Sequence, residues 1–152
     1  MTTISAARFD QILADFQALG IDPLAFRDTW QVLSELPDEQ PVTLINFFRF
    51  RDKAAYPKTY AGEDTNITGE EAFGRYAAVS GDCLKMAGGR FLLVAPFLRT
   101  FIGEAEEWHL TAIGTYPSAD ALARLFEQQD YREAYVHRLA ACERERVSLV
   151  LG

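Results

Sequence analysis

Apolar residues recur at helical spacing in the first part of the chain and predict two helices there. In residues 5–19 they return every three or four positions, which places them on one face of a helix. Asp22 followed by Pro23 is typical of an N-cap and a first helical residue, and the apolar pattern after them continues to the helix-ending Pro37. We therefore expect residues 1–41 to form a helical hairpin and a short link to the segment that follows.

Four later segments have the composition and length of β-strands. Residues 42–50 are rich in β-branched and aromatic side chains, and residues 90–101, 108–116 and 147–151 continue the series. Pro96 restricts the second of these segments to a sheet edge or a bulge, because proline cannot donate a hydrogen bond to a neighbouring strand. The sequence thus predicts four strands, the second of them bent.

Helical patterns occupy the segments between these strands. Thr68, with a glutamate three positions later, forms the capping-box pattern of a helix that ends at two consecutive glycines. Ser118 caps a further helical stretch that reaches about Arg144, with a break near residues 128–130. The polar connection before Thr68 is long for a compact domain, and connections of that length are usually functional or mobile.

The order of elements in residues 42–152 is β-α-β-β-α-β, which predicts an α+β, ferredoxin-like domain. In that fold, four antiparallel strands carry both helices on one face of the sheet. The first strand is apolar on both faces, since Leu44 and Phe48 alternate with Ile45 and Phe47. The face without helices must therefore be covered. Dimerisation is the simplest cover, although the N-terminal hairpin could partly serve.

Composition and charge exclude several classes of protein. With 49% hydrophobic residues, the chain has enough apolar side chains for a globular core. A net charge of -7 and the lack of a basic run argue against a nucleic-acid partner. No apolar stretch approaches the roughly 20 residues that span a bilayer, and no export signal is visible, so we expect a cytoplasmic protein without membrane contacts. Cys83 and Cys142 lie in apolar helical patterns and are expected to be buried, reduced thiols.

Residues 108–116 carry one polar and one apolar row of side chains. If the polar row is functional, His109 and Thr111 line a pocket on the open sheet face, with His109 as an acid or base near neutral pH. A half-exposed sheet face shows the same alternation. Asn46 needs hydrogen-bond partners if it is buried. Arg90 follows two glycines, a place that suits either a bound carboxylate or enolate oxygen or a surface ion pair.

His137 lies late in the last helical stretch. It is a candidate haem ligand or pocket base, or else a histidine that is hydrogen-bonded for structural reasons. The chain has no HExxH, paired CxxC, Walker or dinucleotide-binding motif, and it has only two histidines. Apart from the haem hypothesis, we therefore expect neither a metal centre nor a bound cofactor.

Short motifs are spread along residues 42–151 in the order and spacing expected of one domain. They are Asn46-Phe47, Arg49-Phe50, Ala72, Arg75-Tyr76, Gly88-Gly89-Arg90, Trp108, Tyr116-Pro117-Ser118, Asp130-Tyr131 and His137-Arg138. Together these motifs resemble the dimeric α/β-barrel superfamily, which includes cofactor-free quinone-forming monooxygenases, muconolactone isomerases and haem-dependent chlorite dismutases. Within it, the chain is similar to the uncharacterised bacterial family catalogued as domain of unknown function 1330.

The resemblance implies a barrel-like homodimer with a pocket between the sheet and its covering elements. It also points to Tyr131, His137 and Arg138 as a group, without assigning them to packing or to catalysis. Combined with the residue patterns, it gives His109 as the candidate catalytic residue and a set of candidate ligand-binding residues. That set is Asn46, Phe48, Arg90, Thr111, Tyr131, His137 and Arg138.

These expectations lead to two hypotheses about function. The first is a protein that binds a small, partly apolar organic molecule, where any reaction is of the isomerase or cofactor-free monooxygenase type. The alternative is a noncatalytic protein for ligand sequestration or assembly, with a pocket filled by side chains such as Phe48, Phe91 and Phe97. The sequence does not decide between an enzyme and a binding protein.

Overall fold

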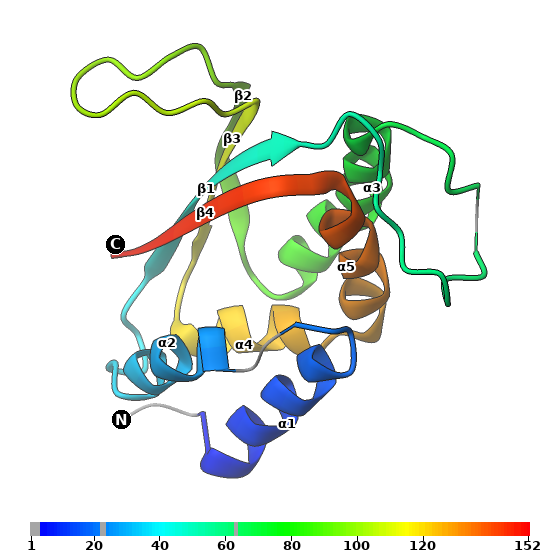
Figure 1. Ribbon diagram of the computed structural model, residues 1–152. Helices are drawn as coiled ribbons and strands as arrows, with labels where there is room; N and C mark the ends of the chain where they lie inside the picture. Colours follow the sequence, from blue (N-terminus) through cyan, green and yellow to red (C-terminus); the bar gives the residue numbers. More distant parts are fainter. Residues whose placement is uncertain (1–3, 22–23, 63) are drawn as a thin grey trace.

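The computed structural model describes residues 4–21, 24–62 and 64–152 (Figure 1). The Asp22-Pro23 cap predicted for the second helix lies outside these residues. The elements are α1 (Ala6–Gln17), α2 (Leu24–Ser34), β1 (Val42–Phe50), α3 (Gly69–Met86), β2 (Arg90–Pro96), β3 (Leu110–Tyr116), α4 (Ala119–Glu127), α5 (Gln129–Ala141) and β4 (Cys142–Leu151).

The four strands form one antiparallel sheet in the order β2-β3-β1-β4. β1 lies between β3 and β4, with Ile45 opposite Ile113 on one side and Ser148 on the other. Helices α3, α4 and α5 lie on the same side of this sheet (Figure 1). The ferredoxin-like α+β fold expected from the order of elements is confirmed.

The N-terminal hairpin packs against the helices and leaves the open face of the sheet uncovered. The Phe16 ring of α1 lies 5.0 Å from the Phe126 ring, and the Trp30 ring of α2 lies 5.4 Å from it. The Arg8 guanidinium forms ion pairs with Asp120 and Glu127 at the two ends of α4. Because α1 and α2 meet α4 in this way, the hairpin does not act as the cover of the open sheet face.

Two strand boundaries differ from the sequence expectation. β2 ends at Pro96, and residues 97–109 leave the sheet as a projecting segment before β3 begins at Leu110 (Figure 1). The last helix ends at Ala141, where β4 starts to pair with the end of β1. The first part of β4 was not predicted as a strand, because its acidic and basic residues alternate and no apolar residue recurs among them.

The helix starts and the turn before β2 match the sequence expectation. Thr68 and Glu71 form the capping box at the start of α3. Ser118 caps α4, which breaks from α5 at Gln128 as expected. Gly88 has a φ of +94°, a conformation that favours glycine over residues with a side chain.

The two faces of β1 have different environments. Leu44 and Phe48 point toward the helices, whereas Ile45 and Phe47 point to the open face, as the alternation predicts. Residues 97–109 project from the sheet beyond β2 and β3. In this segment, Leu98, Phe101 and Ile102 are 93%, 96% and 85% exposed.

Candidate functional site

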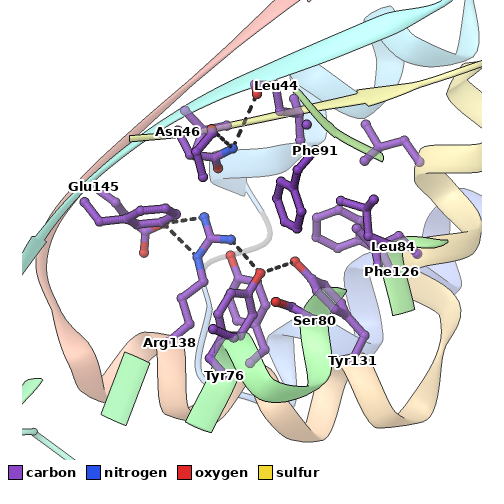
Figure 2. Close-up of a pocket in the computed structure, with 18 of the residues that line it drawn as sticks. Leu44, Asn46, Tyr76, Ser80, Leu84, Phe91, Phe126, Tyr131, Arg138 and Glu145 are labelled. Atoms are coloured by element: carbon purple, nitrogen blue, oxygen red, sulfur yellow. Dashed lines mark hydrogen bonds and ion pairs between the residues drawn. The ribbon is translucent and has the colours of Figure 1, made fainter. Parts of the chain in front are cut away.

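A cavity of about 530 Å³ lies between the sheet and the helices (Figure 2). Most of its wall is apolar, including Leu44 on β1, Leu84 on α3, Phe91 on β2 and Phe126 on α4. The N-terminal hairpin contributes part of the same wall through Trp30 and other residues of α2. The cavity therefore depends on every layer of the fold.

The alternation of side chains along each strand determines which sheet residues line this wall. Asn46 and Phe48 follow Leu44 at intervals of two along β1, so that all three point toward the helices. On β3 the apolar row from Leu110 to Tyr116 points the same way. The polar row of β3 consequently lies on the opposite face of the sheet.

Tyr116 owes its position partly to Gly89. A Cβ atom at Gly89 would lie 2.9 Å from two ring carbons of Tyr116, so the ring fits only because no side chain is present there. Tyr116 itself is 4% exposed and lines the cavity.

The polar end of the cavity is built around Arg138, in the last turn of α5. Its Nε and Nη2 atoms donate to Oε1 of Glu145 on β4, over 3.0 and 2.6 Å. The guanidinium carbon lies 4.9 Å from the ring centre of Phe48 and 5.0 Å from that of Tyr135. The charge of this buried arginine is thus balanced by a carboxylate and surrounded by aromatic rings.

Two tyrosines continue the network from Arg138. Nη1 of Arg138 donates to the Tyr76 hydroxyl over 3.1 Å, and that hydroxyl lies 2.8 Å from the Tyr131 hydroxyl. Figure 2 shows both hydroxyl groups directed toward the cavity from α3 and α5. The sequence arranges this end through helical spacing, since Tyr131, Tyr135 and Arg138 recur on one face of α5.

The protonation states at this end follow from burial. Burial raises the pKa of Tyr116, Tyr131 and Tyr135 above that of an exposed tyrosine. Burial alone lowers the pKa of Arg138, but the nearby Tyr135, Glu145, Tyr76 and Tyr131 together outweigh this effect and raise it. Near neutral pH, these three tyrosines are therefore uncharged hydroxyl donors, and the arginine is a cation.

Asn46 is the polar residue of the sheet wall. Its Nδ2 donates to the backbone oxygen of Ala112 over 3.0 Å and to that of Leu44 over 3.4 Å. No donor to its Oδ1 is found among the described residues, so this oxygen keeps its acceptor capacity. The partners expected for a buried Asn46 are thus backbone groups of β1 and β3.

The structure brings together four of the candidate ligand-binding residues. Asn46, Phe48, Tyr131 and Arg138 all line the cavity. Arg90 and Thr111 lie on the open side of the sheet, where Arg90 is exposed and Thr111 pairs with Phe47.

His109 also lies outside the cavity. It borders a smaller depression of about 330 Å³ at the end of β1, with Arg49 and Glu143 among its neighbours. Its Nδ1 accepts a hydrogen bond from the backbone N–H of Phe50 over 2.8 Å. Trp108 departs from the predicted alternation, because it precedes β3 and packs against Phe47 on the open face.

His137 lies beneath the long connection between β1 and α3. Its Nδ1 is 2.6 Å from the Tyr56 hydroxyl, and Tyr56 and Tyr60 both place their rings against it. Through these contacts, His137 of α5 holds the connection between β1 and α3 against the helix. The catalytic role of His109 and the ligand-binding role of His137 stay predictions.

Several residues of the site were missed by the sequence reasoning. Glu145 lies in an alternating run of charges that resembles a solvated strand, so its pairing with a buried arginine has no local signal. Tyr76, Tyr116 and Tyr135 were assigned to apolar rows or left without a role. The helical recurrence of Tyr131, Tyr135 and Arg138 is the signal that could have identified the polar end.

The cavity contradicts one version of the noncatalytic hypothesis. Phe48 and Phe91 form part of its wall without filling it, and Phe97 packs against Phe47 on the open face. Cys83 and Cys142 are buried and unpaired, as expected. Within residues 4–21, 24–62 and 64–152, no group of three or more metal-ligating side chains occurs, and no helix is long and apolar enough to cross a membrane.

Comparison with known proteins gives a family and two similar solved structures. The sequence model of the domain of unknown function DUF1330 matches residues 58–152. The crystal structure of RPA0582, a protein of unknown function from Rhodopseudomonas palustris, has a TM-score of 0.71 and 30% identity over 82% of this chain and 91% of that chain. Methylated RPA0582 gives a TM-score of 0.72 and 30% identity over 83% and 90%. No curated protein matches.

Proposed function

The chain belongs to the DUF1330 family, and on that premise we propose that it binds one small, mostly apolar organic molecule in its cavity. The observation that carries this proposal is the combination of an apolar wall with a single polar end. Ligand pockets typically have volumes of roughly 300–1,000 Å³ and a few polar groups that orient the ligand. The cavity volume of about 530 Å³ falls within that range.

Asn46, Phe48, Tyr131 and Arg138 supply different parts of this binding site. Phe48 contributes apolar surface, and Asn46 offers an acceptor oxygen from the sheet. Tyr131 brings a hydroxyl group, while Arg138 holds the adjoining Tyr76 hydroxyl in place. The site therefore fits a ligand with an apolar body and one polar group, whether it is stored or converted.

The second part of the proposal is a homodimer formed through the open sheet faces. Leu93 on β2 and Val150 on β4 point to this face and are 50% and 40% exposed. The projecting residues 97–109 add large exposed apolar side chains that the described part of the chain does not cover. A second copy of the chain would bury the open sheet face and the projecting segment, since a two-fold interface joins identical surfaces.

Analytical ultracentrifugation tests the homodimer. We expect a sedimenting mass of two chains, and a mass of one chain at micromolar concentration would reject it. A Leu93→Glu variant serves as the interface variant, because its added charge would be buried between two sheets.

Titration with 1-aminoanthracene tests the binding site. This neutral aromatic probe becomes more fluorescent in apolar surroundings, and we expect saturable binding with one probe per chain. Ala112→Phe places a larger side chain into the cavity from β3, so it is expected to weaken probe binding at least tenfold. Ala78→Phe, on the exposed surface of α3, is the matched control and is expected to bind as the wild type does.

Ser80→Leu is a second cavity-filling variant, from α3 instead of the sheet. Circular dichroism and thermal melting establish that each variant is folded before the titration. If folded Ala112→Phe and Ser80→Leu proteins bind the probe as tightly as the wild type, the probe binds elsewhere and the proposal fails.

A further inference from the structure

The hydrogen bonds at the polar end leave a hydroxyl hydrogen without an acceptor. Tyr76 and Tyr131 have two hydroxyl hydrogens, and their mutual hydrogen bond uses one of them. Neither hydroxyl donates to any other group among the described residues. One O–H donor is therefore available to a molecule in the cavity.

Arg138 decides which hydroxyl keeps the available hydrogen. A guanidinium can only donate, so the hydrogen bond from Nη1 makes Tyr76 the acceptor. An acceptor that receives a hydrogen bond from a cation becomes a stronger donor in turn. This polarisation favours the order Arg138 to Tyr76 to Tyr131, in which the hydrogen of the Tyr131 hydroxyl remains available.

The neighbouring tyrosines reinforce this excess of donors. Tyr116 and Tyr135 line the cavity and are 4% and 5% exposed, and neither hydroxyl has a hydrogen-bond partner among the described residues. Both hydroxyl groups can donate to a molecule in the cavity, so this end of the cavity favours a molecule that supplies acceptors.

The charge balance excludes a strongly ionic ligand. Arg138 is the cation of this end, and Glu145 already compensates it through two hydrogen bonds. A bound carboxylate would leave one buried negative charge in excess, and a bound ammonium one positive charge. An uncharged ligand leaves the pair balanced.

We propose that the cavity takes an uncharged carbonyl compound with an apolar body, and that the Tyr131 hydroxyl donates to its carbonyl oxygen. This inference rests on the proposed function, because it specifies the ligand of the same cavity. In this arrangement the carbonyl group would lie toward Tyr131 and the apolar body among Leu84, Phe91 and Phe126, whose side chains line the cavity (Figure 2).

A matched set of naphthalene compounds tests the inference by calorimetry. The compounds are 2-acetylnaphthalene, 2-ethylnaphthalene, 2-naphthoate and protonated 1-(2-naphthyl)ethylamine, which differ mainly in the polar group. We expect the ketone to bind about tenfold more tightly than the hydrocarbon, because the hydrocarbon leaves the Tyr131 donor unpaired. The two ions are expected to bind more weakly than the ketone.

Tyr131→Phe removes the donor while keeping the ring. Its preference for ketone over hydrocarbon is expected to fall at least threefold, whereas Tyr76→Phe leaves the Tyr131 hydrogen in place and keeps most of the preference. Tyr60→Phe removes a hydroxyl outside the cavity and is the control. The carbonyl stretching frequency of the bound ketone gives a second readout, since it should rise in Tyr131→Phe.

The outcomes separate this inference from the proposed function. If the ketone and hydrocarbon bind equally well, or if Tyr131→Phe keeps the full preference, the cavity binds ligands but the inference is overturned. Tighter binding of the naphthoate or the ammonium ion also overturns it. If none of the four compounds binds, the proposed function itself fails.

Discussion

Arg138 shows how one residue can depend on a partner far more than the partner depends on it. Its side chain is 8% exposed, whereas that of Glu145 is 28% exposed. If Glu145 is removed, the arginine keeps a largely buried charge that has lost its counter-ion. If Arg138 is removed, the carboxylate can still be hydrated.

This asymmetry predicts different stabilities for two variants. Glu145→Ala is expected to lower the free energy of unfolding by roughly 3 kcal/mol, and Arg138→Met by clearly less. Glu143→Ala, which removes an exposed partner of Arg49, should cost at most about 1 kcal/mol. Urea unfolding of the three variants measures the order, and an equal loss in Glu145→Ala and Arg138→Met would contradict the account.

Individual site residues could be predicted from the sequence only where the pattern around them is regular. Asn46 interrupts an apolar strand and was identified from that pattern, whereas Tyr131 and Arg138 were identified through the family resemblance and not through their helical spacing. His109 was chosen from the polar row of its strand and His137 from its chemistry and the family resemblance, and the structure places both outside the cavity. Glu145 acquires its role from β4 lying beside β1, a long-range pairing that no local pattern contains.

At the scale of elements, the turn between α3 and β2 controls the cavity wall. Gly89 lies against the ring of Tyr116, which is buried and cannot move away without disturbing β3. The turn and the cavity are therefore coupled.

Gly89→Ala is expected to destabilise the protein by about 1–3 kcal/mol and to weaken 1-aminoanthracene binding, because the new methyl group displaces the Tyr116 ring. Gly81→Ala is the matched control. A Cβ atom there has no neighbour within 4 Å, and alanine favours the helix by roughly 1 kcal/mol. Thermal melting should move in opposite directions for the two variants, and a shift in the same direction would contradict this explanation.

The elements themselves were mostly predictable. The capping box of α3 and the cap of α4 depend on local hydrogen bonds, which their sequences contain. The ends of β2 and β4 were misplaced, because strand ends depend on where a neighbouring strand begins and ends. Residues 97–101 have strand composition but lie beyond the pairing of β2 with β3.

For the whole molecule, the burial of ionisable groups makes the stability of the fold depend on pH in the alkaline range. Burial raises the pKa of Tyr116, Tyr131 and Tyr135, and it raises that of Cys142 to about 12. In the unfolded chain these groups lose protons near pH 9–10, whereas the folded chain retains them. Their stabilising contribution is complete below that range and is lost as the pH rises above it.

Each of these groups is expected to lower stability by up to about 1.4 kcal/mol per pH unit above its unfolded pKa. Urea unfolding at pH 8, 9.5 and 11 should therefore show a falling midpoint, with the steepest loss above pH 10. A midpoint that stays constant to pH 11 would mean that these hydroxyl and thiol groups are not buried as described.

The organisation of the whole molecule explains why the sequence predicted the fold better than the site. The order of strands and helices is sufficient for the ferredoxin-like arrangement. The cavity, in contrast, forms where side chains of α2, α3, α4, α5 and all four strands meet, and these elements are far apart in the sequence. The N-terminal hairpin, which was expected to be an extension, forms part of that cavity wall.

A crystal structure of the protein grown with 2-acetylnaphthalene is the most direct test of whether the cavity binds a carbonyl compound. We expect the naphthalene rings among Leu84, Phe91 and Phe126, with the ketone oxygen within hydrogen-bond distance of the Tyr131 hydroxyl. A cavity closed by its own side chains, with the ketone bound only at another surface, would contradict it.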